Sequence, residues 1–284
     1  MTAAVAVVTG AARGIGRAIA ADLVARGYRV VIGDLDLAAT TATARELGTG
    51  VIAVRLDVTD AALMAESVAE IERSVGPIAV WVNNAGIMPT GPFVSHSREL
   101  IDAVISVDFQ SLVETTALVF PGMLRRKSGN ILNVASATAV KPLAGLAVYS
   151  ATKAAVVAFS DALRRELRGS GVTVGVILPN LVSTAMGAGI TAPRGFGAVT
   201  APQVARAAMR ALERGTFATV VPRHLGPMLR VSRLLPVSVQ DWMDDRIGTD
   251  RIGLGGDATA RETYLTGVVP PKNDAPPRHS PVDN

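Results

Sequence analysis

The stretch Thr9-Gly10-Ala11-Ala12-Arg13-Gly14-Ile15-Gly16 follows a short apolar run, Val5–Thr9, and opens a segment of helical character, Gly14–Arg26. Glycines at such a junction let the backbone turn tightly and approach a pyrophosphate, which then lies on the amides of the helix N-terminus. A glycine cluster alone is not specific, because glycine turns also serve simple packing. Its position between the first strand and the first helix favours a dinucleotide-binding crevice.

The first 180 residues alternate short β-branched runs with longer runs rich in Ala, Leu and Arg. Strands that are apolar throughout belong to a sheet covered on both faces. The alternation therefore predicts an α/β fold of one domain, a Rossmann-like doubly wound parallel sheet of about seven strands. The expected strands are Val5–Thr9, Arg29–Asp34, Val51–Leu56, Ile78–Val82, Asn130–Ala135, Val172–Leu178 and Phe217–Val221, and the expected helices are Gly14–Arg26, Leu37–Leu47, Ala61–Ser74, Arg98–Leu124, Tyr149–Arg168 and Ala201–Arg214.

The character of the chain changes after Pro222. We expect a dinucleotide-binding and catalytic domain over 1–222, a helical extension over 223–265 and a disordered tail over 266–284, which is rich in Pro, Asn and Asp. The segment 223–251 mixes Arg and His with Leu, Met and Trp. It fits a subunit contact, a pocket cover or a surface helix on an anionic membrane, and packing on the domain or a sister subunit is favoured over membrane contact.

Composition excludes several classes of function. The chain has no cysteine, which rules out disulfides, thiol catalysis and cysteine-ligated zinc, and its three histidines (His96, His224 and His279) are scattered, so no metal site is expected. The formal charge is only +4 and aromatics make up 4%, so nucleic acid is a poor candidate partner. No basic leader and no long charge-free apolar run are present, which predicts a cytoplasmic protein.

The glycine spacing is Gly-x-x-x-Gly-x-Gly, and two further motifs stand at matching places: Asn83-Asn84-Ala85-Gly86 after the fourth strand and Tyr149-Ser150-Ala151-Thr152-Lys153. Over about residues 3 to 222 the chain resembles the short-chain dehydrogenase/reductase family. The resemblance implies an NAD(P)-dependent oxidoreductase acting on an alcohol or ketone. It also implies a homodimer or homotetramer, formed through the helices at 98–124 and 149–168.

Two residues bear on the choice of cofactor. Asp34, at the end of the second strand, can accept hydrogen bonds from the adenosine ribose hydroxyls, although a helix N-cap is the alternative. Arg13 favours NADP instead. A cation at a helix N-terminus opposes the helix dipole, and the 2′-phosphate of NADP would compensate the charge of Arg13. We give Asp34 more weight, since a carboxylate repels a 2′-phosphate at contact range. NAD is therefore expected, with NADP as the alternative.

The resemblance implies the remaining cofactor contacts. It places Asp57 against the adenine amino group, with a helix-capping turn as the alternative, and Thr184 at the carboxamide, with an N-cap as the alternative. Asn180 can take the left-handed conformation of the glycine usual at that place. The full expected set is Gly10, Arg13, Gly14, Ile15, Gly16, Asp34, Asp57, Val58, Asn84, Ala85, Gly86, Tyr149, Lys153, Pro179 and Thr184.

Tyr149 and Lys153 are the candidate acid–base pair. A phenol has a pKa near 10, and a nearby cation lowers it by stabilising phenolate. Residues four apart on a helix share a face, so Lys153 can lie near Tyr149. The alternative is that Tyr149 is an aromatic residue at the start of a helix and Lys153 a surface lysine, since both would give the same sequence pattern. The resemblance adds Ser136, which would hold the substrate oxygen while Tyr149 exchanges its proton and Lys153 binds the nicotinamide ribose.

One catalytic position departs from the family pattern. The family has Val-Asn-x-x-Gly where this chain has Val107-Asp108-Phe109-Gln110-Ser111. In the family the asparagine helps to hold a water that leads protons to the lysine. Asp108 either pairs with Lys153 and keeps it protonated, or disturbs that relay. We expect activity to survive; the alternative is a dinucleotide-binding regulatory protein with impaired turnover.

The substrate end is predicted to be apolar. Ser136, Ala137, Leu143 and Tyr149 are the expected substrate contacts, and the glycine-rich stretch 185–197 reads as a mobile lid. Few charged residues stand in these segments; Lys141 and Arg194 are the exceptions. A hydrophobic secondary alcohol or ketone is therefore the expected substrate, although apolar pockets do not name their ligands.

Overall fold

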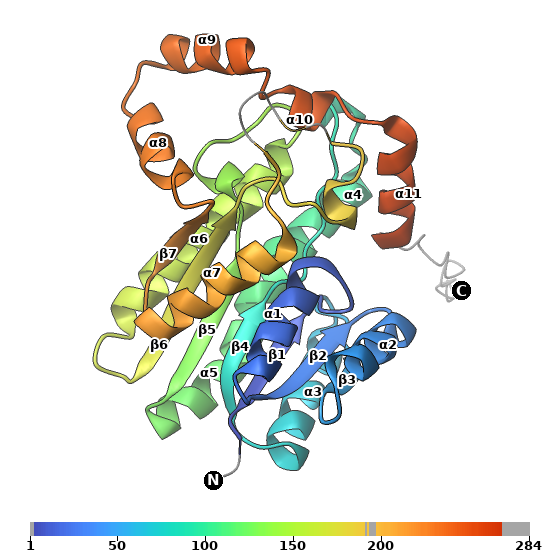
Figure 1. Ribbon diagram of the computed structural model, residues 1–284, viewed down its shortest axis with the longest axis vertical. Coiled ribbons are helices and arrows are strands. Elements are labelled where there is room, and N and C mark those ends of the chain that lie inside the picture. Colours follow the sequence, from blue (N-terminus) through green and yellow to red (C-terminus); the bar gives the residue numbers. More distant parts are fainter. Residues whose placement is uncertain (1–2, 191, 193–196, 269–284) are drawn as a thin grey trace, which may run out of the picture.

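The computed structural model describes residues 3–190, 192 and 197–268, and it confirms the doubly wound sheet (Figure 1). Seven parallel strands lie in the order β3-β2-β1-β4-β5-β6-β7. The strands are β1 (Val5–Thr9), β2 (Arg29–Asp34), β3 (Ile52–Arg55), β4 (Ile78–Asn83), β5 (Gly129–Val134), β6 (Val172–Pro179) and β7 (Ala218–Val221). The order reverses between β1 and β4, and a crevice opens at the carboxyl ends of strands around such a switch point.

Helices cover both faces of the sheet, as the apolar strands require. Within β1, Ala6 and Val8 enter one core cluster while Val5 and Val7 enter the other, because successive strand side chains point to opposite faces. The first cluster is covered by α1, α2 and α7, and the second by α3 and α5. The helices up to β7 are α1 (Gly14–Ala25), α2 (Leu37–Leu47), α3 (Ala61–Ser74), α4 (Arg98–Ile105), α5 (Ser111–Arg126), α6 (Ala147–Glu166) and α7 (Ala201–Arg214).

The single helix expected over 98–124 is wrong in one respect. A π-helical turn, Ser106–Gln110, separates α4 from α5, and its residue Asp108 is buried. A π turn adds a residue to the helical repeat and re-aims the side chains around it, often at functional sites. The interruption therefore lies at the position where the sequence departs from the family pattern.

Contrary to the expectation from sequence, the stretch Arg98–Arg126 is long and apolar enough to cross a membrane by length and composition. Three of its apolar side chains, Leu112, Val119 and Met123, are instead buried in the core of the protein. A helix that lies against its own sheet passes the same test, so the stretch is a core helix here.

Residues 223–268, the part of the segment after Pro222 that the structure describes, form four helices, which are α8 (Leu225–Ser232), α9 (Val237–Ile247), α10 (Arg251–Leu254) and α11 (Ala258–Val268). Figure 1 shows α8, α9 and α10 beyond the carboxyl ends of the strands and α11 beside them. The tail was expected to begin at residue 266, but α11 continues to Val268. The rest of that prediction, 269–284, lies outside the described residues.

Candidate active site

A cavity of about 890 Å³ lies at the carboxyl ends of the central strands. It collects most of the residues that the sequence singled out, although they come from segments spread from Gly10 to Thr184. Lining it are Gly10, Arg13, Gly14, Ile15, Asp34, Asp57, Val58, Asn84, Ala85, Gly86, Ser136, Ala137, Leu143, Tyr149, Lys153, Pro179 and Thr184. Gly16 and Asp108 are buried and do not line the cavity.

The glycine turn is built for close backbone approach. Gly10 has φ +62°, and a Cβ there would lie 2.8 Å from the Cα of Ala85, so only glycine fits without a shift. A Cβ on Gly16 would overlap the carbonyl oxygen of Gly10, which places Gly16 in packing rather than in the lining. Asn84 donates from Nδ2 to the carbonyl oxygens of Thr9 and Gly10, both at 2.9 Å, and so braces the turn from β4.

Asp34 is held at the end of β2 with its side chain on the cavity. Its Oδ2 accepts from the Ala12 amide at 3.1 Å, whereas Asp36 is the residue that caps α2. The helix-cap alternative for Asp34 is therefore wrong. Arg13 is exposed and extended at the N-terminus of α1, where it also lines the cavity.

Asp57 and Thr184 complete the cofactor end. Asp57 Oδ1 accepts from the amide (2.9 Å) and the hydroxyl (2.6 Å) of Thr59, so it shapes its own turn, and Asp60 caps the following helix. Thr184 makes no side-chain cap for the short turn that follows it. Its side chain lies against Gly14, where a Cβ would meet the Thr184 methyl at 3.4 Å.

The three expected catalytic side chains converge at the centre of the cavity. Ser136 follows β5, and Tyr149 and Lys153 lie one turn apart near the start of α6, which begins at Ala147 rather than at Tyr149 as expected. Burial raises the pKa of the Tyr149 phenol, the negative charge of Asp108 raises it further, and the Ser136 hydrogen bond opposes both.

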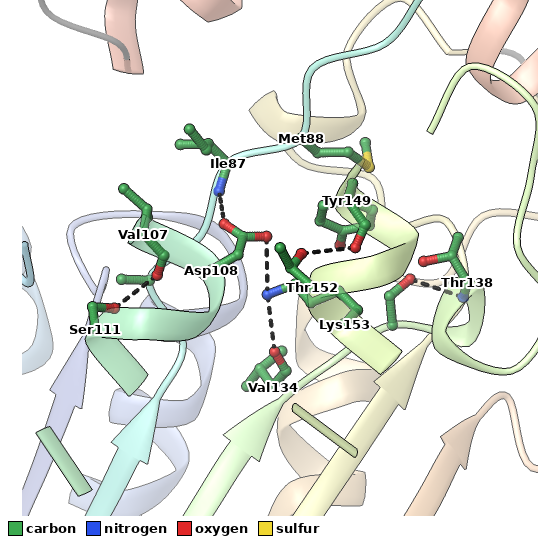
Figure 2. A network of polar contacts seen from close by, with 12 residues as sticks. Ile87, Met88, Val107, Asp108, Ser111, Val134, Thr138, Tyr149, Thr152 and Lys153 are labelled. Atoms are coloured by element: carbon green, nitrogen blue, oxygen red, sulfur yellow. Dashed lines mark hydrogen bonds and ion pairs between the residues drawn. The ribbon is translucent and has the colours of Figure 1, made fainter. Parts of the chain in front are cut away.

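Asp108 and Lys153 form a buried ion pair beneath these hydroxyls (Figure 2). The Lys153 Nζ lies 3.3 Å from Asp108 Oδ2, and the two residues are 4% and 1% exposed. Asp108 Oδ1 accepts from the Ile87 amide at 2.7 Å, and Lys153 Nζ donates to the Val134 carbonyl at 3.3 Å. Burial raises the pKa of the Asp108 carboxyl, while Lys153 and the Ile87 amide oppose that shift. The geometry thus favours pairing among the two outcomes that the sequence left open.

The substrate end is lined by an apolar cluster that packs on Tyr149. Its members come from four separate segments of the chain and are Met88, Leu143, Leu146, Met186, Ile190 and Ile252. The expected contacts Ala137 and Leu143 are both on the cavity. The lid over 185–197 is described only in part, since residues 191 and 193–196, Arg194 included, lie outside the described residues.

Two residues at the cavity were missed from the sequence. Tyr264 of α11 lines it, and Arg261 lies behind it, 5% exposed. The one feature of the sequence that could have linked Arg261 with Tyr264 is their separation by three residues, which puts both side chains on one face of a helix. Their segment straddled the expected start of the disordered tail, so nothing in the local pattern connected them to a site more than 70 residues away.

Comparison with known proteins agrees with this arrangement. The family model described as short chain dehydrogenase matches residues 4–195, and the chain belongs to that family of oxidoreductases. The ketoacyl reductase HetN of Nostoc sp. is 33% identical over 251 residues, covering 84% of this chain and 88% of that protein. The sorbitol dehydrogenase of Cereibacter sphaeroides is 38% identical over 178 residues, covering 62% and 70%.

Two further similarities extend the comparison. The 3-oxoacyl-[acyl-carrier-protein] reductase FabG of Escherichia coli is 33% identical over 182 residues, covering 64% of this chain and 75% of that protein. A crystal structure of a short chain dehydrogenase/reductase from Burkholderia phymatum in complex with NAD has a TM-score of 0.75 at 24% identity. It covers 82% of this chain and 93% of its own, which shows the shared fold.

Proposed function

We propose that this oxidoreductase interconverts a hydrophobic secondary alcohol and its ketone, with NAD as the preferred cofactor and Tyr149 as the acid–base group. The observation that carries the proposal is the convergence of Ser136, Tyr149 and Lys153 on one cavity with the glycine turn. Hydride transfer is the chemistry that the bound nicotinamide supplies. The chain itself binds, orients and moves the proton.

The residues present fit a dinucleotide. A Cβ on Gly10 would clash with the backbone of Ala85, and Gly10 and Gly14 both have positive φ angles (+62° and +59°), which favour glycine in a turn that a pyrophosphate approaches closely. The amides of α1 begin beside this turn. Asp34 lies at the far end of the same cavity, where a ribose diol would meet its carboxylate. A 2′-phosphate there would face a negative charge, which is why NAD is preferred, and exposed Arg13 is the group that would favour NADP instead.

The proton step falls to three side chains. Ser136 donates to the substrate oxygen and orients it, and Tyr149 gives its proton to a ketone or takes one from an alcohol. Lys153 has three N–H donors; one reaches the Val134 carbonyl, while the ammonium and Asp108 Oδ2 are paired by charge at 3.3 Å. The ammonium therefore has N–H donors left for the nicotinamide ribose, so the ion pair and cofactor binding are compatible.

The apolar lining supports a hydrophobic substrate. The cluster around Leu143, Leu146 and Ile252 surrounds Tyr149 and offers no charge to a ligand. Two of the named relatives are ketoacyl reductases and one is a sorbitol dehydrogenase, so both apolar and polar alcohols belong in the test.

The experiment is a panel of secondary alcohols and ketones, aliphatic, acyl, steroid and polyol, assayed with NAD and NADP by the absorbance of the reduced nicotinamide. The proposal expects kcat/KM to rise with apolar substituents and to favour NAD. Turnover restricted to polyols, or a preference for NADP, would overturn the substrate or the cofactor assignment respectively.

A second candidate rests on Asp108, which stands where the family has asparagine. It is a dinucleotide-binding protein with impaired turnover. This candidate is supported if the wild-type protein binds NADH but turns over no substrate, and the Asp108→Asn variant is active. Measurable turnover by the wild type dismisses this candidate.

We also propose a homodimer or homotetramer through α4, α5 and α6, supported by the exposed side chains of Ile105 and Leu124. Light scattering on the purified protein tests it, and a monomer at micromolar concentration would contradict it. Exposed Leu234 and Trp242 on the α8–α9 segment are consistent with a further subunit contact, which we favour over a membrane surface. Cytoplasmic location stays a prediction.

A further inference from the structure

Arg261 reaches from α11 into two loops that lie far apart in the sequence. Its guanidinium donates to Thr90 Oγ1 at 3.1 Å and to the Met88 carbonyl in the loop after β4. It also donates to the carbonyls of Met186 at 2.6 Å and Ala188 at 3.4 Å in the loop after β6. Both loops line the cavity, so one side chain ties its two walls together.

These partners are all uncharged. None of the ion pairs among residues 3–190, 192 and 197–268 includes Arg261, although the residue is 5% exposed. Burying an unpaired guanidinium is costly unless its donors are satisfied, and burial lowers the pKa of Arg261. The hydrogen bonds to the two loops offset that cost only while α11 stays docked, so docking and loop closure are coupled.

Tyr264 lies one turn further along α11 and faces the cavity. Its Oη accepts from the Met88 amide at 3.1 Å, and the Arg261 guanidinium stacks on its ring at 4.8 Å. Within the described part of the chain, the Met88 amide is the one hydrogen-bond partner of that hydroxyl. Burial raises its pKa to about 12, so the O–H is kept and remains free to donate.

The helix before α11 is fitted to the site as well. Ile252 of α10 belongs to the apolar cluster on Tyr149, and a Cβ on Gly253 would overlap the Ala144 carbonyl oxygen. Asp257 donates its amide to the Gly189 carbonyl at 2.9 Å. The segment from 252 to 264 therefore follows the outside of the pocket closely at several independent points.

We propose that the segment 252–264 is a clasp that completes the binding site for the oxidoreductase reaction proposed above. Arg261 is a positioning residue that holds residues 87–90 after β4 and 186–190 after β6 closed over the bound molecules. Tyr264 is a further binding residue, whose hydroxyl donates to an oxygen acceptor in the cavity. That acceptor belongs either to the cofactor or to the substrate. NADH affinity and the KM for substrate in Tyr264→Phe distinguish the two.

The first experiment measures NADH binding by fluorescence in the absence of substrate, and therefore does not depend on turnover. Arg261→Met is expected to raise the NADH dissociation rate about tenfold, a loss comparable to that of several hydrogen bonds weakened together. Thr266→Ala is the matched control, because this exposed residue of the same helix lies outside 252–264 and its hydroxyl donates to the Glu262 carbonyl. It is expected to leave the rate unchanged.

Hydrogen exchange distinguishes a clasp from general destabilisation. In Arg261→Met, the loops at 87–90 and 186–190 are expected to lose protection together while β1 and β4 keep theirs. Arg261→Lys keeps the charge but loses the fork that reaches both loops, and is expected to show the same pattern in weaker form. Unchanged NADH dissociation with unchanged protection of both loops would overturn the clasp.

Tyr264→Phe removes only the free O–H and the acceptor of the Met88 amide. Weaker NADH binding by about three- to tenfold assigns the acceptor to the cofactor. Unchanged NADH binding with a KM for substrate raised by the same factor, at unchanged kcat, assigns it to the substrate. If neither changes, Tyr264 is not a binding residue. If the wild type binds NADH but turns over no substrate, the proposed function fails. The clasp is still tested by the NADH dissociation rate and by hydrogen exchange of the two loops.

Discussion

Asp108→Asn tests how the buried ion pair sets the acid–base behaviour of Tyr149. The substitution keeps the shape and an acceptor for the Ile87 amide but removes the negative charge beside Lys153. Since Asp108 raises the pKa of Tyr149 in the folded protein, losing its charge lets the Lys153 ammonium act on the phenol uncompensated. The pKa of Tyr149 is therefore expected to fall.

The size of the effect is bounded by the attraction of Lys153 for the phenolate, which the paired Asp108 charge offsets in the wild type. Lys153 Nζ lies 5.6 Å from the centre of the Tyr149 ring. At an effective dielectric of about 20, a unit charge at that distance contributes roughly 3 kcal/mol, or about 2 pKa units. Solvent entering the open cavity reduces this, so a fall of about 1 to 2 units is expected.

The assay is the pH profile of kcat/KM for alcohol oxidation, followed by NADH formation. Oxidation needs phenolate as the base, so activity rises as the pH passes the pKa of Tyr149. The acidic limb of Asp108→Asn is expected about 1 to 2 pH units below that of the wild type. Glu114→Gln, which removes a carboxylate from α5 that pairs with Gln110 outside the site, serves as the charge-matched control. A limb that stays in place, or moves upward, would refute the reasoning.

Three other predictions follow from the same geometry. Asp34→Ser removes the carboxylate at the ribose end, and the ratio of kcat/KM for NAD over NADP is expected to fall at least tenfold, measured with one alcohol; an unchanged ratio contradicts the role of Asp34. Gly10→Ala places a Cβ 2.8 Å from the Cα of Ala85 at φ +62°, so NADH binding measured by fluorescence is expected to weaken strongly, and normal affinity would rule out the tight turn. Met123→Ala empties a fully buried position and is expected to cost about 2–5 kcal/mol in urea unfolding with cofactor affinity kept, whereas a loss below about 1 kcal/mol would place Met123 outside the core.

The sheet was predictable because its information is local. Each strand from β1 to β6 is an apolar run between turn signals, and the alternation with helices leaves few topologies to consider. The cofactor end was also predictable, since Gly10, Asp34 and Asn84 all follow strands whose carboxyl ends meet at one edge of the sheet.

The rest depends on contacts that no local pattern carries. The π turn at Ser106–Gln110 arises where a buried carboxylate meets an ammonium from another helix, and a helix propensity pattern does not register it. Arg261 and Tyr264 belong to the site only because α11 packs back on loops that precede it by about 75 to 175 residues. From the sequence alone, both residues belonged to the helical extension 223–265, and nothing connected that extension with the cavity.

The most direct test of the central claim is Tyr149→Phe, which removes the acid–base hydroxyl and keeps the ring in the apolar cluster. NADH affinity is measured by fluorescence, and turnover is measured with whichever alcohol or ketone the wild type uses best. The account predicts unchanged NADH affinity and a kcat at least about a hundredfold lower, as the loss of a general acid–base group requires. A fully active Tyr149→Phe enzyme would contradict it.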